Sequence, residues 1–269
     1  MGEDGRIGMG DVIDLSGLVG KRVLITRPLP EGETTARLIQ QHGGVVQLTP
    51  VMRVAPPDDP QPFFTGLANL GHYQGIVFTS AHGARAFLEH VPTPCQIAKI
   101  YAVGEKTAVP LLHAGLTPAI PDHPVGSLEL AQDILQGSVP GDRFLFVRAQ
   151  EGRDDLITIL VREGCLVDRV AAYKMAPIPF LDQQTLDLLL EGRIDAIPFF
   201  SGRSAQVFFN LLPADQRESL LKKTVLAALS PATARAMQSV GMRVDVISPR
   251  PHVEAMLVSL AQTLADLTG

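Results

Sequence analysis

The chain has 269 residues, and at roughly 150 residues per domain this length predicts one large or two ordinary domains. Hydrophobic residues make up 46% and charged residues 19%, a composition that excludes disordered, collagen-like and purely coiled-coil proteins. The 23 Lys and Arg against 28 Asp and Glu give a net charge of −5, so we expect no general attraction to nucleic acid or to a membrane surface.

The apolar runs of the chain are too short to cross a membrane. The longest unbroken run that we find is residues 225–229, whereas a transmembrane helix needs about 20 apolar residues. The first 20 residues carry acids and glycines instead of the basic-then-apolar pattern of a signal peptide. Cys95 and Cys165 stand far apart without a CxxC motif, which predicts neither a disulfide framework nor a zinc site. We therefore predict a cytoplasmic protein.

In chain order, short apolar runs alternate with helix-compatible stretches. The proline at position 110 argues against the helix that contains it, unless it lies in the first turn. Continuous apolar strands between helices predict a parallel sheet covered on both faces, and hence an α/β fold. The expected strands are residues 23–26, 75–79, 100–103, 144–147, 196–200, 225–229 and 244–247, and the clearest helices are residues 33–41, 81–89 and 105–113.

The two halves of the sequence repeat each other. Residues 21–27 align with residues 142–148 at an offset of 121, and Phe78-Thr-Ser80 matches Phe199-Phe-Ser201 at the same offset. Further on, Thr107-Ala108 matches Thr233-Ala234 at an offset of 126, which places a five-residue insertion at about residues 213–223. An ordered series of matches with one small gap indicates an internal duplication, and so two similar lobes.

Two segments interrupt the alternation of strands and helices. Residues 45–56 and 165–177 are long, β-rich and end in Ala-Pro, and they correspond at the same offset. We expect these two long strands to form a two-stranded ladder between the lobes, which would also serve as a hinge.

Several familiar motifs are incomplete in this chain. The glycines of residues 5–10 precede the first strand and open no helix, and residues 104–107 contain only a fragment of a phosphate-binding loop. The seven histidines form no HExxH pair, and no Gly-x-Ser-x-Gly elbow occurs. We therefore expect neither a metal nor an organic cofactor.

The remaining motifs, taken as an ordered set, resemble uroporphyrinogen-III synthase. The chain departs from the family's usual pattern at His82, where Asn is frequent, at Phe200, which replaces Thr, and at Ser230, where Gly-Pro is usual. The matching motifs include Ile-Thr-Arg-Pro at 25–28, Phe-Thr-Ser at 78–80, Val-Gly-Glu-Lys-Thr at 103–107, Ala-Tyr-Lys at 172–174 and Ser-Pro-Ala-Thr at 230–233.

The resemblance implies a lyase of tetrapyrrole biosynthesis that works without a cofactor. Such an enzyme converts linear hydroxymethylbilane into cyclic uroporphyrinogen III, inverting ring D and releasing water. The resemblance further implies two interleaved α/β lobes. The boundaries carried onto this chain are residues 21–48 plus 178–269 for one lobe, 57–165 for the other, 49–56 and 166–177 for the connecting ladder, and 1–20 for an N-terminal extension.

Two other functions fit two similar α/β lobes. A small-molecule binding protein without catalysis shares the lobes and the hinge, although it usually carries a secretory signal. A two-domain glycosyltransferase is usually longer and needs a nucleotide-sugar site that we do not find. We expect a monomer with hydroxymethylbilane as its substrate, and hydroxymethylbilane synthase is a transient partner to be tested because its product is labile.

The candidate site residues follow the expected strands. Ligands of parallel α/β sheets bind beyond the carboxyl ends of the strands, where helix N-termini direct N–H groups at anions. Ser80, Thr107, Ser201 and Thr233 fall at such junctions, and helix capping is the alternative role for each.

Three arginines and one tyrosine complete the candidate set. Arg27, Arg148 and Arg153 suit a substrate with eight carboxylates, and a surface ion pair is the alternative for each. By resemblance, Tyr173 matches the family's tyrosine that is proposed to help hydroxide leave ring A. A phenol with a reference pKa of about 10 can donate a proton, although packing on a strand face is its alternative role.

Overall fold

The computed structural model describes residues 13–91, 99–121, 126–152 and 154–267. The chain forms two units, each with its own sheet and core. The first unit runs up to Arg53 and resumes at Pro177, and the second spans Val54–Ala176. The α/β fold of two interleaved lobes is therefore confirmed. Within the described ranges, no helix is both long and apolar enough to cross a membrane.

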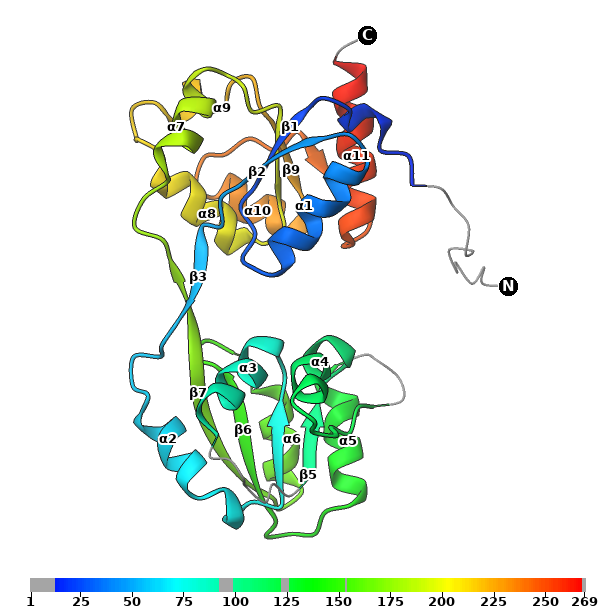
Figure 1. Cartoon of the computed structure of the whole chain (residues 1–269), viewed down its shortest axis with the longest axis vertical. Coiled ribbons are helices and arrows are strands. Elements are labelled where there is room, and N and C mark those ends of the chain that lie inside the picture. The colour runs from blue at the N-terminus through cyan, green and yellow to red at the C-terminus, as the bar shows by residue number, and fades with distance from the viewer. Residues whose placement is uncertain (1–12, 92–98, 122–125, 153, 268–269) are drawn as a thin grey trace, which may run out of the picture. The chain divides into compact units, whose positions relative to one another are not determined.

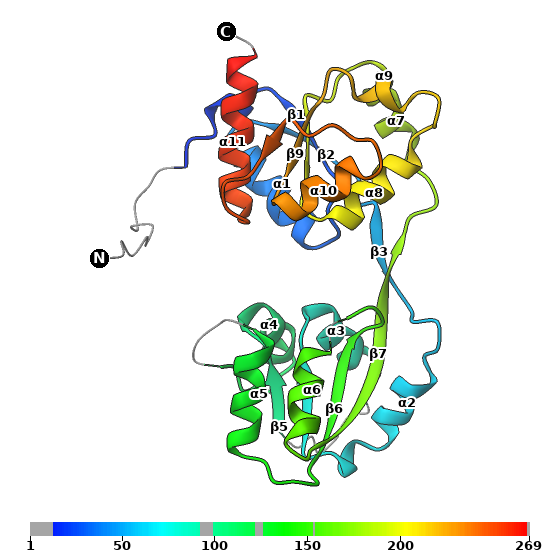
Figure 2. The ribbon, with the colours of Figure 1, turned by 180° about the vertical axis from the view of Figure 1, so that it is seen from behind.

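The first unit is a five-stranded sheet between helices (Figures 1 and 2). Its strand order is β10-β9-β8-β1-β2, and the pairs are parallel. The strands are β1 (Arg22–Ile25), β2 (Val45–Leu48), β8 (Ala196–Phe199), β9 (Val225–Ala228) and β10 (Val246–Ile247), and the helices are α1 (Glu31–Gln41), α7 (Gln183–Leu190), α8 (Gly202–Leu211), α9 (Arg217–Leu221), α10 (Pro231–Gln238) and α11 (Val253–Asp266), after a 3-10 turn η1 (Ser16–Leu18).

The second unit is built in the same way. Its strand order is β3-β7-β6-β4-β5, and β4, β5, β6 and the first part of β7 pair in parallel. The strands are β3 (Met52–Ala55), β4 (Gly75–Phe78), β5 (Lys99–Ala102), β6 (Arg143–Ala149) and β7 (Leu166–Pro177), and the helices are α2 (Gln61–Ala68), α3 (Ala81–His90), α4 (Glu105–His113), α5 (Ser127–Gln136) and α6 (Asp155–Arg162), with a 3-10 turn η2 (Leu70–His72).

The repeat in the sequence is also a repeat in topology. Strands β9-β8-β1-β2 of the first sheet correspond to β5-β4-β6-β7 of the second, in the same order. An isolated bridge between Tyr101 and Ala119 takes the place of β10 beside β5. Thirteen residues separate α8 from β9, whereas eight separate α3 from β5, and α9 lies in the longer connection. The helix α9 therefore occupies the predicted insertion.

Equivalent aromatic pairs fill the two cores. Phe78 and Phe87 lie 5.2 Å apart between ring centroids in the second unit, and their counterparts Phe199 and Phe208 lie 5.6 Å apart in the first. All four side chains are fully buried. Burial on this scale lets each unit support its own sheet.

The prediction of one long strand over residues 45–56 is wrong. The segment contributes β2 to the first sheet and then β3, which lies beside β7 in the second. The residues between β2 and β3 still pair with the end of β1, because the amides of Thr49 and Val51 donate to the carbonyls of Ile25 and Thr26. By contrast, β7 is continuous over twelve residues. The two-stranded connection therefore consists of β3 and the end of β7.

Helix α4 tolerates a proline beyond its first turn. Pro110 is the sixth of its nine residues, so the hydrogen bond to the carbonyl of Lys106 is missing. The helix nevertheless buries Thr107, Ala108 and Leu111 on one face. This packing outweighs the loss of one backbone hydrogen bond.

Candidate functional site

Ser80 joins the carboxyl end of β4 to the start of α3. Its backbone is extended, with φ −153° and ψ 147°, and its Oγ accepts a hydrogen bond of 3.1 Å from the amide of Gly83. This satisfies one of the free N–H groups in the first turn, as an N-cap does. Ser80 is only half-buried, so its hydroxyl is within reach of solvent.

Tyr173 brings a second hydroxyl to the same place. Its OH donates to Ser80 Oγ at 3.0 Å, and its ring lies 5.5 Å from the imidazole of His82 between centroids. Tyr173 is opposite Ala149, at the end of β6, in the register of β7. The structure therefore brings together two of the predicted residues, Tyr173 and Ser80.

Thr107 lies in the first turn of α4, which follows β5. Gly104 precedes this helix in an extended conformation and has no side chain to cap it. The amide of Thr107 donates to the carbonyl of Gly104 at 3.0 Å, and its side chain is buried. Its predicted role in substrate binding stays a prediction.

The first unit repeats this arrangement at the carboxyl ends of β8 and β9. Ser201 caps α8 by accepting from the amide of Ser204 at 3.1 Å, with nearly the same backbone angles as Ser80. Ser230 caps α10 by accepting from the amide of Thr233 at 3.2 Å. Thr233 is buried, like its counterpart in α4. Capping, the alternative role for these residues, therefore holds for Ser80 and Ser201.

Arg27 follows β1 and is partly exposed. Its guanidinium carbon lies 4.7 Å from the centroid of the Phe200 ring, and Nη1 donates to Thr35 Oγ1 at 3.3 Å. Burial lowers the pKa of the guanidinium, and the charge of Glu31 opposes that shift. Arg27 stays cationic, because an arginine does not lose its proton in proteins.

Arg148 occupies the equivalent position in the second unit but is 4% exposed. It forms an ion pair with Asp154, and its Nε donates to the carbonyl of Ala149 at 3.0 Å. Asp154 also accepts from Arg169 at 2.8 Å. A Cβ on Gly152 would lie 2.4 Å from the Arg148 guanidinium, so a larger residue there would require the guanidinium to move. Arg148 thus forms an ion pair, which was its alternative role, but the arginine is buried and does not lie on the surface.

Arg153, the third candidate arginine, lies outside the described residues. The other candidates divide between the units: Arg27, Ser201 and Thr233 belong to the first, whereas Ser80, Thr107, Arg148 and Tyr173 belong to the second.

Sequence reasoning missed the partners of these residues. It did not foresee that Asp154 forms ion pairs with both Arg148 and Arg169. It also did not foresee that the ring of Phe200 lies against Arg27. The carboxylate six positions after Arg148 was the signal available for the first contact. The second joins β1 to β8, which are far apart in the sequence, so no local pattern could reveal it.

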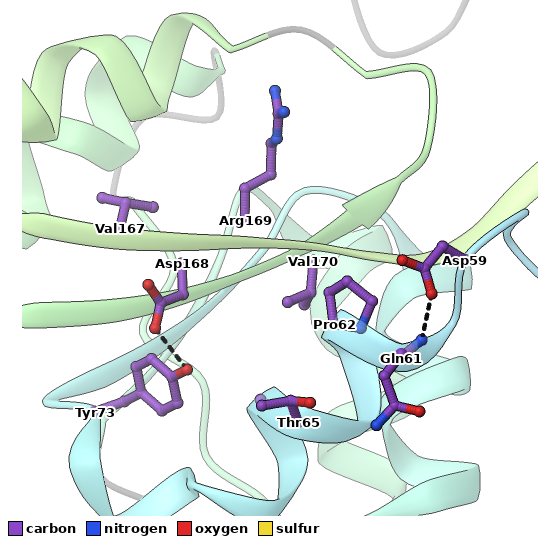
Figure 3. Close-up of a pocket in the computed structure, with 10 residues that line it drawn as sticks. Asp59, Gln61, Pro62, Thr65, Tyr73, Val167, Asp168, Arg169 and Val170 are labelled. Carbon is purple, nitrogen blue, oxygen red and sulfur yellow. Dashed lines mark hydrogen bonds between the residues drawn. The ribbon is translucent and has the colours of Figure 1, made fainter.

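Two hollows, one in each unit, lie away from these residues. One of about 460 Å³ lies between α2 and the start of β7, where Tyr73 donates to Asp168 at 2.8 Å and the amide of Gln61 donates to Asp59 at 3.0 Å (Figure 3). One of about 600 Å³ occupies the equivalent place in the first unit, between α7 and the start of β2. Both lie at the amino ends of the strands, so neither contains a predicted site residue.

No group of three or more His, Cys, Asp or Glu in the described part of the chain is placed to hold a metal ion. The donors that gather at the carboxyl strand ends are hydroxyls, backbone N–H groups and guanidiniums, which suit anions.

A family model described as Uroporphyrinogen-III synthase HemD matches residues 33–258. The chain belongs to this family. The match begins within α1 and ends within α11, so it covers elements of both units. The resemblance seen in the motifs is thereby confirmed.

Individual relatives agree with the family model. A uroporphyrinogen-III synthase of Chlorobaculum parvum is 26% identical over 239 residues, which cover 84% of this chain and 92% of the relative. One of Synechococcus elongatus is 24% identical over 264 residues, covering 93% and 98%.

Solved structures share the fold. A uroporphyrinogen-III synthetase of Helicobacter pylori has a TM-score of 0.57 at 19% identity, covering 91% of this chain and 100% of the other. A mutant uroporphyrinogen III synthase of Thermus thermophilus has a TM-score of 0.52 at 20% identity, covering 92% and 100%. Both carry two-unit α/β folds like this one.

Proposed function

We propose that the protein is a uroporphyrinogen-III synthase, a lyase that closes hydroxymethylbilane into uroporphyrinogen III with inversion of ring D and loss of water. The observation that carries this function is the family match over residues 33–258, which spans the elements that bear all the candidate donors except Arg27. A small-molecule binding protein without catalysis is not favoured by any of the reported relatives.

The first task of such an enzyme is to bind a flexible polyanion with a chain whose own net charge is −5. Helices α3, α4, α8 and α10 all begin just beyond the carboxyl ends of strands, where their N–H groups favour negative charge. We assign carboxylate binding to these helix starts together with Ser80, Thr107, Ser201, Thr233 and Arg27. Arg148 and Arg153 also stay in the proposed set of substrate-binding residues.

Ser80 is well suited to donate to a carboxylate. A serine hydroxyl has two lone pairs and one proton. Its lone pairs accept from Tyr173 OH and from the amide of Gly83, at 3.0 and 3.1 Å. The remaining Ser80 proton is therefore directed to a third group, and a substrate carboxylate can take that place.

Tyr173 is the proposed catalytic residue. Loss of hydroxide from ring A is driven by the electrons of the pyrrole and gives an electron-poor azafulvene. A phenol can assist by donating its single proton to the departing oxygen, and in the resting structure the hydrogen bond to Ser80 holds that phenol in place. For the transfer the proton turns from Ser80 Oγ to the departing oxygen, which leaves as water, and the phenolate is then free to accept the Ser80 proton as a hydrogen bond. Because the pyrrole supplies most of the driving force, we expect this help to be modest.

The harder task is to direct ring closure. The bilane can close without inversion, so the last ring must be held for attack at its substituted carbon. A preference of about a thousandfold needs only about 4 kcal/mol of selective transition-state stabilisation. Positioning by several carboxylate contacts can supply this amount. We therefore propose a distributed site in which no single side chain is indispensable.

The experiment that tests the function is an isomer assay. The purified protein is incubated with hydroxymethylbilane, the products are oxidised, and the type I and type III uroporphyrins are separated by chromatography. A synthase gives a large excess of type III over the protein-free control. An isomer ratio equal to that control would refute the proposed function and would favour a binding protein.

A transient partner is a separate proposal. Hydroxymethylbilane is labile, so direct transfer from hydroxymethylbilane synthase would protect it. Co-sedimentation of the two proteins in the presence of substrate tests this contact. Independent sedimentation of the two proteins under those conditions would contradict it.

A further inference from the structure

Arg27 differs from the other arginine that lies on an aromatic ring. In the first unit, the Arg217 guanidinium lies 4.8 Å from the Phe209 centroid, and its Nε and Nη2 donate to the carbonyls of Leu212 and Asn210. Arg217 is thus held by the backbone around it. Among the described residues, the guanidinium of Arg27 donates one hydrogen bond, to Thr35.

The ring of Phe200 contacts the Arg27 guanidinium without accepting a hydrogen bond from it. A guanidinium has five N–H donors, all directed outward in its own plane. A cation–π contact uses none of these donors, so an edge of the guanidinium stays available. A carboxylate needs such an edge, because its two oxygens pair with two parallel N–H groups.

Phe200 lies at the carboxyl end of β8, immediately before Ser201, and β8 is the neighbour of β1 in the sheet. Phe200 is partly buried and packs against the core of the first unit, and this packing holds its side chain in place. The cation is therefore held at the same sheet edge as the cap of α8.

We propose that Phe200 is a positioning residue, which holds the Arg27 guanidinium over its ring so that a free edge of the guanidinium binds a substrate carboxylate bidentately. This inference rests on the proposed function and extends it to a residue that contributes no polar contact of its own. The equivalent arginine of the second unit, Arg148, is held in another way, because its Nη1 pairs with Asp154 and its Nε donates to the carbonyl of Ala149.

The test is a set of variants assayed with hydroxymethylbilane. Phe200→Met keeps the volume and the burial but removes the ring. We expect the KM to rise about three- to tenfold, as the loss of a cation–π contact permits, while kcat changes less than twofold. Phe200→Tyr keeps the ring and should keep the KM of the parent protein.

A double-mutant cycle separates positioning from packing. Arg27→Gln alone should raise the KM about tenfold or more. If Phe200 acts only through Arg27, adding Phe200→Met to Arg27→Gln should raise the KM by less than a further twofold. Equal effects of Phe200→Met in the presence and in the absence of Arg27 would overturn the proposal.

The matched control is Phe209→Met, which removes the ring under Arg217 in the same unit. This variant should leave the KM unchanged, and a KM increase equal to that of Phe200→Met would also overturn the proposal. The thermal midpoints of all variants show whether they fold. Absence of type III product from the parent protein would refute the proposed function itself, whereas an active parent with an unchanged KM in Phe200→Met refutes only this inference.

Discussion

Arg27 and Arg148 stand at equivalent positions of the duplicated units, yet their surroundings are opposite. Arg27 is partly exposed and lies on an aromatic ring, whereas Arg148 is buried and paired with Asp154. The serines nearby did not diverge in this way, because Ser80 and Ser201 cap their helices with almost identical geometry. The comparison shows that duplication kept the groups that organise the backbone, while the long side chains took different roles.

The largest expected effect concerns the two cores. Phe87→Ala and Phe208→Ala each remove a fully buried ring from an equivalent helix. Each should lower the free energy of unfolding by about 3–5 kcal/mol, the cost of a large cavity. Urea denaturation measures this loss.

Hydrogen exchange then shows where each core variant acts. Phe87→Ala should weaken amide protection mainly in β4, β5 and β6, and Phe208→Ala mainly in β1, β8 and β9. Equal loss of protection in both units from either variant would contradict two separate cores.

The next effect tests the two arginines. Asp154→Ala removes the Asp154 carboxylate from the buried Arg148 and should cost about 2–3 kcal/mol, less than the loss from a fully buried pair because Asp154 is partly exposed. Arg27→Gln should cost less than about 1 kcal/mol, since no carboxylate in the described part of the chain forms an ion pair with Arg27. Thermal and urea unfolding of both variants make the comparison, and similar losses of stability would contradict the division of roles.

The caps should show a smaller difference. Ser201→Ala removes one cap and a local hydrogen bond of 2.9 Å to Ser204 Oγ, and should cost about 1 kcal/mol. Ser80→Ala removes a cap and also the acceptor of the hydroxyl of Tyr173, a buried residue of another strand, so its cost should be greater by about 1 kcal/mol. The urea midpoints of the two variants measure this difference in stability. A larger loss of stability in Ser201→Ala than in Ser80→Ala would contradict the prediction.

A last expected effect is a dependence on alkaline pH. Burial, and then the hydrogen bond and charge of Asp168, raise the pKa of Tyr73 to about 12. Because this pKa is above the unfolded value of about 10, the stabilisation is complete below pH 10 and is lost as the pH rises towards 12. Urea midpoints between pH 9 and 11.5 should fall more steeply for the parent protein than for Tyr73→Phe. Parallel slopes would contradict this assignment.

Much of the fold could be predicted because most strands are short apolar runs between helices, as β4 and β8 are. Such runs mark buried parallel strands whichever sheet they join. The alternation did not show that residues 45–56 contribute to two sheets, because both pieces look equally β-rich in the sequence. Pairing partners far along the chain decide that point.

The candidate site could be predicted only in part. Ser80 and Ser201 follow apolar runs, so their capping positions could be read from the sequence. The contacts of Arg27 and Arg148 could not, since identical residues in aligned motifs met Phe200 in one unit and Asp154 in the other. Burial of a charge depends on neighbours that the motif does not contain.

The most direct test of a distributed synthase site is the isomer assay on Tyr173→Phe beside the parent protein. This change removes the phenolic proton and keeps the ring that packs near His82. We predict a slower reaction whose product is still mainly the type III isomer. Complete loss of activity in a folded Tyr173→Phe protein would contradict the account.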